Sequence, residues 1–162
     1  MSARASNRFG FTLIEMLVTV VIVALLASVA LPLAEVSARR AREHELRMAL
    51  REIRSALDAY RQAVEEGRVA SAMHESGYPG SLQLLVDGVP DASSPDRKKR
   101  IYFLRRIPRD PIWPDAAHSD EETWGKRSYA SSSDEPEEGA DVFDVYTRSP
   151  GTGLNGIPYS RW

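Results

Sequence analysis

The chain has 162 residues, which is room for about one domain, and its net charge of -2 provides no basic field that would attract nucleic acid. We therefore expect no nucleic-acid partner. The sequence contains no cysteine, which excludes disulfides, thiolate nucleophiles and zinc-thiolate sites. The composition is 43% hydrophobic and 27% charged, but the apolar residues are concentrated near the N-terminus.

Residues 1–10 precede an apolar run and have the composition of a targeting leader. They contain Arg4 and Arg8, several small polar residues and no acid. An ordinary secretory signal is cut after its apolar run, and here Ala30 and Ala34 would supply the small residues for such a site. The composition alone leaves both sites of cleavage open.

The apolar run covers residues 11–34, and Glu15 is its only charged residue. As a helix it would be roughly 36 Å long at 1.5 Å per residue, enough to cross a hydrocarbon core of about 30 Å. The alternative is a buried core helix, but the polar remainder is too small to enclose it on all sides. We therefore predict a membrane-spanning helix, with membrane lipid as its partner.

A second helical pattern follows the apolar run without an intervening glycine. Apolar residues recur at alternating steps of four and three at Leu46, Leu50, Ile53, Leu57, Tyr60 and Val64. This spacing predicts one helix from about residue 11 to about residue 66, bent at Pro32 and stopped at Gly67. We interpret the apolar row as the face that packs on a domain, since a coiled coil would continue the row for longer.

The remaining residues predict an α+β fold, in which a small antiparallel sheet packs on the long helix. Residues 82–86 favour a short helix or strand between the turn at 77–80 and Asp87-Gly88. Strands are expected at 101–104, 127–130 and 142–146.

Charged and polar loops are expected between these elements. They are the polar segment 91–96, the basic run 97–100, which we expect to be solvated, and the acidic loop 134–139.

The junction Gly10-Phe11-Thr12-Leu13-Ile14-Glu15 resembles the processing site of the type IV pilin superfamily. The resemblance implies that prepilin peptidase cuts between Gly10 and Phe11 and N-methylates Phe11. Glu15 then stands at the fifth mature position, and Pro32 falls where the family commonly bends its helix.

The resemblance also implies a division of the chain and a location. Residues 1–10 are a prepilin leader, 11–34 a transmembrane and assembly helix, and 35–162 a periplasmic pseudopilin domain carried by a single pass through the bacterial inner membrane.

Glu15 also has a physical argument of its own. An ionised carboxylate among apolar residues is costly and usually has a partner. Cleavage would create one in the amine of Phe11 on a neighbouring subunit, so assembly through Phe11, Glu15 and Pro32 would neutralise the charge. The alternative is that Glu15 lies near the membrane interface and is solvated.

The rest of the chain resembles the major, G-type pseudopilin of type II secretion. The signals occur in the family's order: Gly77-Tyr78-Pro79, the segment Leu104–Pro111 with its Asp110-Pro111, Trp124-Gly125 and Asp144-Val145-Tyr146. An acidic insertion at 112–123 separates Asp-Pro from Trp-Gly, unlike in that family.

The same resemblance implies a calcium site in the C-terminal loop. Residues 147–156 contain no acid, however, and calcium prefers carboxylate ligands. Only Asp141 and Asp144 remain as weak candidates for this metal, and we expect no other cofactor.

No catalytic constellation is apparent, so we expect no enzyme activity. The three histidines, His44, His74 and His118, lack metal-ligand spacing. The acidic residues around His118, which are Asp115, Asp120, Glu121 and Glu122, are explained more simply as an exposed acidic loop.

We therefore expect a structural role, as a subunit of a periplasmic pseudopilus that acts in protein secretion. Its partners would be further copies of the chain in a homopolymer, minor pseudopilins, prepilin peptidase and the inner-membrane secretion assembly platform. The alternatives are a minor pseudopilin, a type IV pilin for adhesion or DNA uptake, and a membrane-tethered binding module that does not polymerise.

Overall fold

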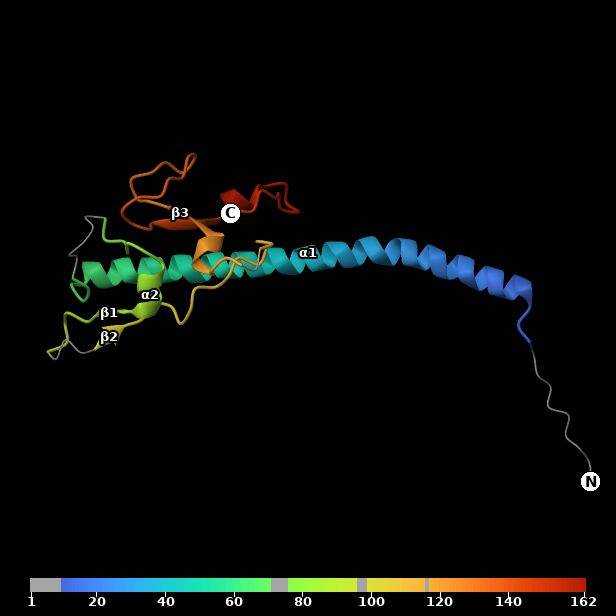
Figure 1. The fold of residues 1–162 in the computed structure, drawn as a ribbon, viewed down its shortest axis with the longest axis horizontal. Coiled ribbons are helices and arrows are strands. Elements are labelled where there is room, and N and C mark those ends of the chain that lie inside the picture. Colours follow the sequence, from blue (N-terminus) through green and yellow to red (C-terminus); the bar gives the residue numbers. More distant parts are fainter. Residues whose placement is uncertain (1–9, 71–75, 96–98, 116) are drawn as a thin grey trace, which may run out of the picture. The chain divides into compact units, whose positions relative to one another are not determined.

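The computed structural model describes residues 10–70, 76–95, 99–115 and 117–162. The chain divides into two compact units, Met1–Arg39 and Arg40–Trp162. Helix α1, Leu13–Glu65, contributes its N-terminal part to the first unit and its C-terminal part to the second (Figure 1). Leader residues 1–9 and His74 lie outside the described part of the chain.

The predicted extent of α1 is confirmed, and both of its ends have a local cause. Pro32 lies inside the helix without ending it. At the C-terminal end, Gly67 adopts φ +70°. The N–H of Gly67 donates to the carbonyl of Val64, and that of Arg68 to the carbonyl of Ala63, both at 2.9 Å. This pattern is the Schellman motif, in which glycine tolerates the left-handed conformation that stops a helix.

The apolar row predicted on α1 is the centre of the core in the second unit. Leu46 and Ile53 are fully buried, and Leu50, Leu57 and Tyr60 are at most 8% exposed. The row is covered by buried side chains from the rest of the unit: Val69, Tyr78, Leu82, Leu85, Val89, Leu104, Ile107, Trp124, Val142, Val145 and Tyr159. The helix therefore holds its domain by one face.

The rest of the second unit contains little regular structure. Helix α2, Gln83–Asp87, is followed by β1, Val89–Pro90, and β2, Arg100–Ile101, which pair antiparallel. Strands β3, Trp124–Arg127, and β4, Asp144–Thr147, form a second antiparallel pair, with Gly125 opposite Tyr146. Short 3-10 helices cover Glu121–Thr123 and Tyr159–Arg161.

The α+β fold class is confirmed, but the single predicted sheet is replaced by two separate two-stranded ladders. Figure 1 shows β1 and β2 on one side of the C-terminal half of α1 and β3 on the other. The helix thus lies between the two ladders within this unit.

All three predicted strands differ in extent from the observed ones. The strand expected at 142–146 begins at Asp144, and the N–H of Val142 donates to the carbonyl of Pro79 at 2.8 Å instead. The strand expected at 101–104 ends at Ile101, because the N–H groups of Phe103 and Leu104 both donate to the carbonyl of Leu85 at 3.0 Å. The strand expected at 127–130 lies at 124–127 instead. Ser128 turns away because its N–H donates to the carbonyl of Glu137, at 2.9 Å.

The predicted loops are confirmed where the structure describes them, except that Arg100, the last residue of the basic run, belongs to β2. Residues 134–139 are exposed except for Pro136, which is half-buried. Within the basic run, Arg97 and Lys98 lie outside the described residues, while Arg100 donates to the carbonyl of Gly88 at 2.6 Å. In the polar loop, Asp91 is buried, and its bonds to the hydroxyl and N–H of Ser93 lower the pKa of its carboxyl.

Substitution of Ile53 tests the buried row. We expect Ile53→Ala to lower the free energy of unfolding of a fragment starting at Arg40 by about 2–5 kcal/mol, because it leaves a cavity between α1 and its cover. Met48→Ala, on an exposed side of the same helix, is the matched control and should change it by less than about 1 kcal/mol. Equal effects in chemical denaturation would contradict the assignment of this face to the core.

Candidate processing and assembly site

The predicted cleavage bond lies immediately before the first turn of α1. Gly10 and Phe11 precede the helix and are exposed, with 76% of Phe11 accessible. Thr12 caps the helix: its hydroxyl accepts the N–H of Glu15 at 3.3 Å, and its carbonyl accepts the N–H of Met16 at 3.1 Å. Threonine followed three residues later by glutamate is the capping-box pattern. The cap separates an accessible, non-helical Gly10-Phe11 bond from the helix that follows.

Glu15 lies in the first turn of α1 and is exposed. A negative charge is favourable there because unpaired N–H groups make the N-terminus of a helix electropositive. Among the described residues of the same copy, no cationic side chain pairs with the Glu15 carboxylate. The helix end alone is a weak partner for a carboxylate in an apolar setting.

The N-terminal part of α1 leaves its apolar side chains uncovered. Leu13, Ile14, Val20, Val29, Leu31 and Leu33 are 66–84% exposed. Across the described chain, α1 is the one helix long and apolar enough to cross a membrane, and its most apolar window has a mean hydropathy of 2.7 with no residue buried.

The few polar side chains in this segment are compatible with lipid. The hydroxyl of Thr19 donates to the carbonyl of Met16 at 2.8 Å, and that of Ser28 donates to the carbonyl of Leu25 at 2.7 Å. Hydroxyl groups bonded in this way need no water. The segment therefore presents an almost wholly apolar surface.

Comparison with family models finds the prokaryotic N-terminal methylation motif at residues 5–31. The motif is a type IV pilin-like prepilin signal, and it includes the Gly10-Phe11 junction, Glu15 and most of the apolar run. It supports the type IV pilin superfamily. It also supports processing by prepilin peptidase, self-assembly into filaments and membrane anchoring by the N-terminal helix. No curated protein and no solved structure matches the chain.

The signals that pointed to one branch of the superfamily lie together in the second unit. Trp124 donates through Nε1 to the carbonyl of Pro108 at 2.7 Å. Asp110 is buried and accepts the hydroxyl of Thr147 at the end of β4. The three segments 108–111, 124–125 and 144–147 thus form one packed group.

Gly125 leaves room in this group for the ring of its cross-strand partner, Tyr146. A Cβ at this residue would lie 2.3 Å from the ring of Tyr146, its partner across the β3–β4 ladder. The Trp-Gly and Asp-Val-Tyr signals therefore have a packing reason.

The two calcium candidates are already engaged by protein groups. Asp144 accepts Nε of Arg54 at 2.7 Å and lies 3.4 Å from an Arg127 nitrogen. Asp141 is buried and accepts the hydroxyl of Ser128 and the N–H of Tyr129 at 2.9 and 2.8 Å. Two arginines beside Asp144 oppose a cation there, and the described residues contain no group of three or more acidic or histidine side chains suited to a metal. These donors do not fit the calcium site that the resemblance implies.

Arg54 fastens the C-terminal segment to α1. Besides its ion pair with Asp144, its Nη2 donates to the carbonyl of Val145 at 3.1 Å and to a main-chain oxygen of Trp162 at 2.7 Å. Glu43 of α1 holds the same segment at other points. Its side chain is 4% exposed and accepts the N–H of Leu154 at 2.8 Å and the hydroxyl of Tyr159 at 3.0 Å.

Sequence reasoning missed both residues because charged helical positions are usually solvated. Glu43 had one detectable signal, since it lies three residues before Leu46 on the line of the apolar row.

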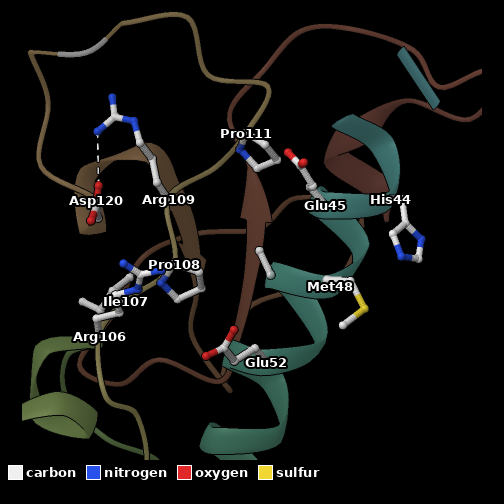
Figure 2. A pocket seen from close by; sticks show the side chains of 11 residues that line it. His44, Glu45, Met48, Glu52, Arg106, Ile107, Pro108, Arg109, Pro111 and Asp120 are labelled. Carbon is white, nitrogen blue, oxygen red and sulfur yellow. Dashed lines mark hydrogen bonds and ion pairs between the residues drawn. The ribbon is translucent and has the colours of Figure 1, made fainter. Parts of the chain in front are cut away.

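The acidic insertion is organised around His118. Its Nδ1 lies 2.7 Å from Asp115, and its ring meets that of Trp113 edge to face. The N–H of Ala117 and then the ring of His118 lower the pKa of the Asp115 carboxyl. His44 lies on α1, where it lines a groove together with Arg109 and Asp120 (Figure 2).

Substitution of Arg54 tests the fastening of the C-terminal segment. Arg54→Gln removes one ion pair and two hydrogen bonds, so we expect the free energy of unfolding to fall by about 1–3 kcal/mol. Hydrogen exchange of residues 147–162 should accelerate at the same time. Arg51→Gln is the matched control, because Arg51 is exposed on the same helix and has no carboxylate partner among the described residues.

Calcium provides a second control in the same unfolding measurement. A bound metal at 100 times its Kd would stabilise the fold by about 2.7 kcal/mol, whereas we expect the unsubstituted chain to unfold identically with calcium and with chelator. Equal effects of Arg54→Gln and Arg51→Gln, or stabilisation by calcium, would contradict this account of the segment.

Proposed function

We propose that the chain is a structural subunit of a periplasmic pseudopilus that acts in type II protein secretion. Prepilin peptidase removes residues 1–10, and the apolar part of α1 then holds the subunit in the inner membrane until it joins the filament. The observation that carries this proposal is the methylation motif at residues 5–31, followed by an apolar helix that its own chain leaves uncovered.

Orientation follows from the processing step. Prepilin cleavage takes place on the cytoplasmic side of the membrane in this superfamily, so Phe11 faces inward and the unit Arg40–Trp162 is periplasmic. The filament forms when the apolar helices leave lipid and pack on one another, which exchanges one apolar environment for another. Apolar surface alone therefore gives little preference for one register.

Three features favour a major pseudopilin over a pilin for adhesion or DNA uptake. The Asp-Pro, Trp-Gly and Asp-Val-Tyr signals pack as one group. The chain has no cysteine with which to clamp its C-terminal region. Arg54 and Glu43 hold that region by hydrogen bonds instead. The genes beside this one offer a direct check, because a secretin and a secretion ATPase would accompany a type II subunit.

We also propose that the chain has no enzymatic activity of its own. Within the described residues, the side chains of the acidic insertion bond to one another and to Arg109. These contacts explain the cluster as a folded loop. The hydroxyl and the N–H of Ser119 both donate to Glu122 at 2.8 Å, so this pair closes a turn within the loop.

Processing provides the first test of the proposal. We expect the protein extracted from membranes to begin at Phe11 and to carry one added methyl group, because the accessible Gly10-Phe11 bond precedes the helix cap. Intact-mass analysis measures both changes, and cells without prepilin peptidase are the control. A chain beginning after Ala30 or Ala34 would overturn the proposal, since the domain would then be released from the membrane.

Glu15→Gln tests the role of the charge in assembly. The variant keeps the shape of the side chain but leaves the ammonium of Phe11 on the neighbouring subunit without a partner. We expect normal leader cleavage and insertion but a filament yield lowered at least about tenfold, a loss equivalent to about 1.4 kcal/mol per docking step. Sheared filaments and processed precursor are quantified side by side.

Two further results make this test decisive. Glu35→Gln, a change of the same kind beyond the apolar run, is the matched control and should leave the yield unchanged. Normal yield from Glu15→Gln would show that the charge does not drive docking. Absence of filaments from the unsubstituted chain, expressed with its assembly machinery, would instead favour a tethered binding module.

A further inference from the structure

The C-terminal half of α1 carries a row of arginines beside its buried row. Arg40, Arg47, Arg51 and Arg54 follow one another at steps of seven, four and three, so they share one flank of the helix. Arg47, Arg51 and Arg54 line a groove of about 460 Å³ together with Arg161 and Trp162. Four cationic side chains thus gather around one depression in the surface.

Most of this charge is not neutralised within one copy. Arg54 is paired with Asp144, but Arg47 stacks on the ring of Trp162 with a separation of 4.2 Å. Arg51 and Arg161 are exposed, and no carboxylate among the described residues pairs with Arg47, Arg51 or Arg161. Like charges held this close repel one another, and an anionic partner would relieve that repulsion.

The opposite flank of the buried row carries acidic side chains. Glu45 and Glu52 line a second groove, of about 500 Å³, between α1 and the segment 106–111. Figure 2 shows both carboxylates on the side of the helix that faces this segment, with His44 on the other side.

The balance of charge in this second groove is negative. Arg109 is held by Asp120 at 3.3 Å, which leaves Arg106 against two carboxylates. Glu45 and Glu52 are exposed and form no ion pair in the described part of the chain.

The two rows match in spacing as well as in sign. Glu45 and Glu52 are seven residues apart, as are Arg40 and Arg47, and also Arg47 and Arg54. Seven residues are nearly two turns, or about 10.5 Å along a helix axis. Two helices side by side can therefore place each carboxylate of one opposite a guanidinium of the other.

We propose that the arginine groove of one subunit receives the Glu45 and Glu52 flank of a second copy. Because the two surfaces differ and lie on opposite flanks of one helix, the contact is heterologous and repeats from subunit to subunit instead of closing a dimer. This inference rests on the proposed filament and adds the lateral contact between its periplasmic domains. Charge complementarity selects the neighbour and the register, which the apolar helices by themselves do not.

Charge reversal in the full-length chain tests the contact. Arg51→Glu with Arg161→Glu reverses the basic flank without touching Arg54 or the stacked Arg47, and Glu45→Arg with Glu52→Arg reverses the acidic flank. Each pair should lower the yield of sheared filaments by about tenfold or more, because like charges then face each other. The chain carrying all four changes should recover most of the yield. Glu135→Arg with Glu137→Arg, in the exposed acidic loop, is the matched control and should assemble normally.

The outcomes separate this inference from the proposed function. Processed precursor must be equally abundant in all variants, since the substituted residues are exposed. Normal filament yields from both charge-reversed pairs would overturn the proposed contact but not the proposed filament. A low filament yield from Arg51→Glu with Arg161→Glu that is not restored in the fourfold variant would also overturn the contact. That result would mean that the arginines bind another anion. Binding of anionic lipid vesicles by the unsubstituted chain, but not by Arg51→Glu with Arg161→Glu, would identify lipid as that anion.

Discussion

One helix has to satisfy two different surroundings, and the rest of the structure follows from that constraint. The first part of α1 exposes leucine, valine and isoleucine on every side, whereas the second part buries a single row from Leu46 to Tyr60. An all-round apolar helix is stable only in lipid or among other apolar helices. The N-terminal part of α1 therefore requires an apolar environment that its own chain does not supply. A pilin-like subunit meets two such environments in succession, first the membrane and then the filament.

The second unit must then be ordered with few strands and no disulfide. Its two ladders cover only two and four residue pairs. Buried polar groups compensate for this by tying loops together: Asp110 to Thr147, Trp124 to Pro108, Asp141 to Ser128, and Glu43 to Tyr159. A buried hydrogen bond contributes modestly when formed and is expensive to break, so such a set favours one loop arrangement over others. The core row on α1 provides the common base for these loops.

The parts of the fold that the sequence predicted are those with strong local signals. The periodic row and the glycine at 67 were sufficient to place α1 and its end. The strands were less predictable because their limits depend on distant carbonyls. Leu85 takes the N–H groups of Phe103 and Leu104 out of a strand, and Glu137 does the same to Ser128. A single sheet was expected because nothing in the sequence shows that the long helix lies between the two ladders.

The candidate site divides in the same way. Gly10, Phe11 and Glu15 lie close together in the sequence, so their motif could be recognised directly. The structure adds the Thr12 cap, which explains why the bond before the helix is accessible. Arg54, Glu43 and the two charged flanks depend on which face of α1 the domain covers. The buried row of Leu46, Ile53 and Leu57 determines on which flank of the helix every other residue lies. Arg51 and Glu52 therefore lie on opposite flanks, although they are neighbours in sequence. In a filament held by apolar helices, which slide over one another with little preference, such sided charges are what can specify a single register.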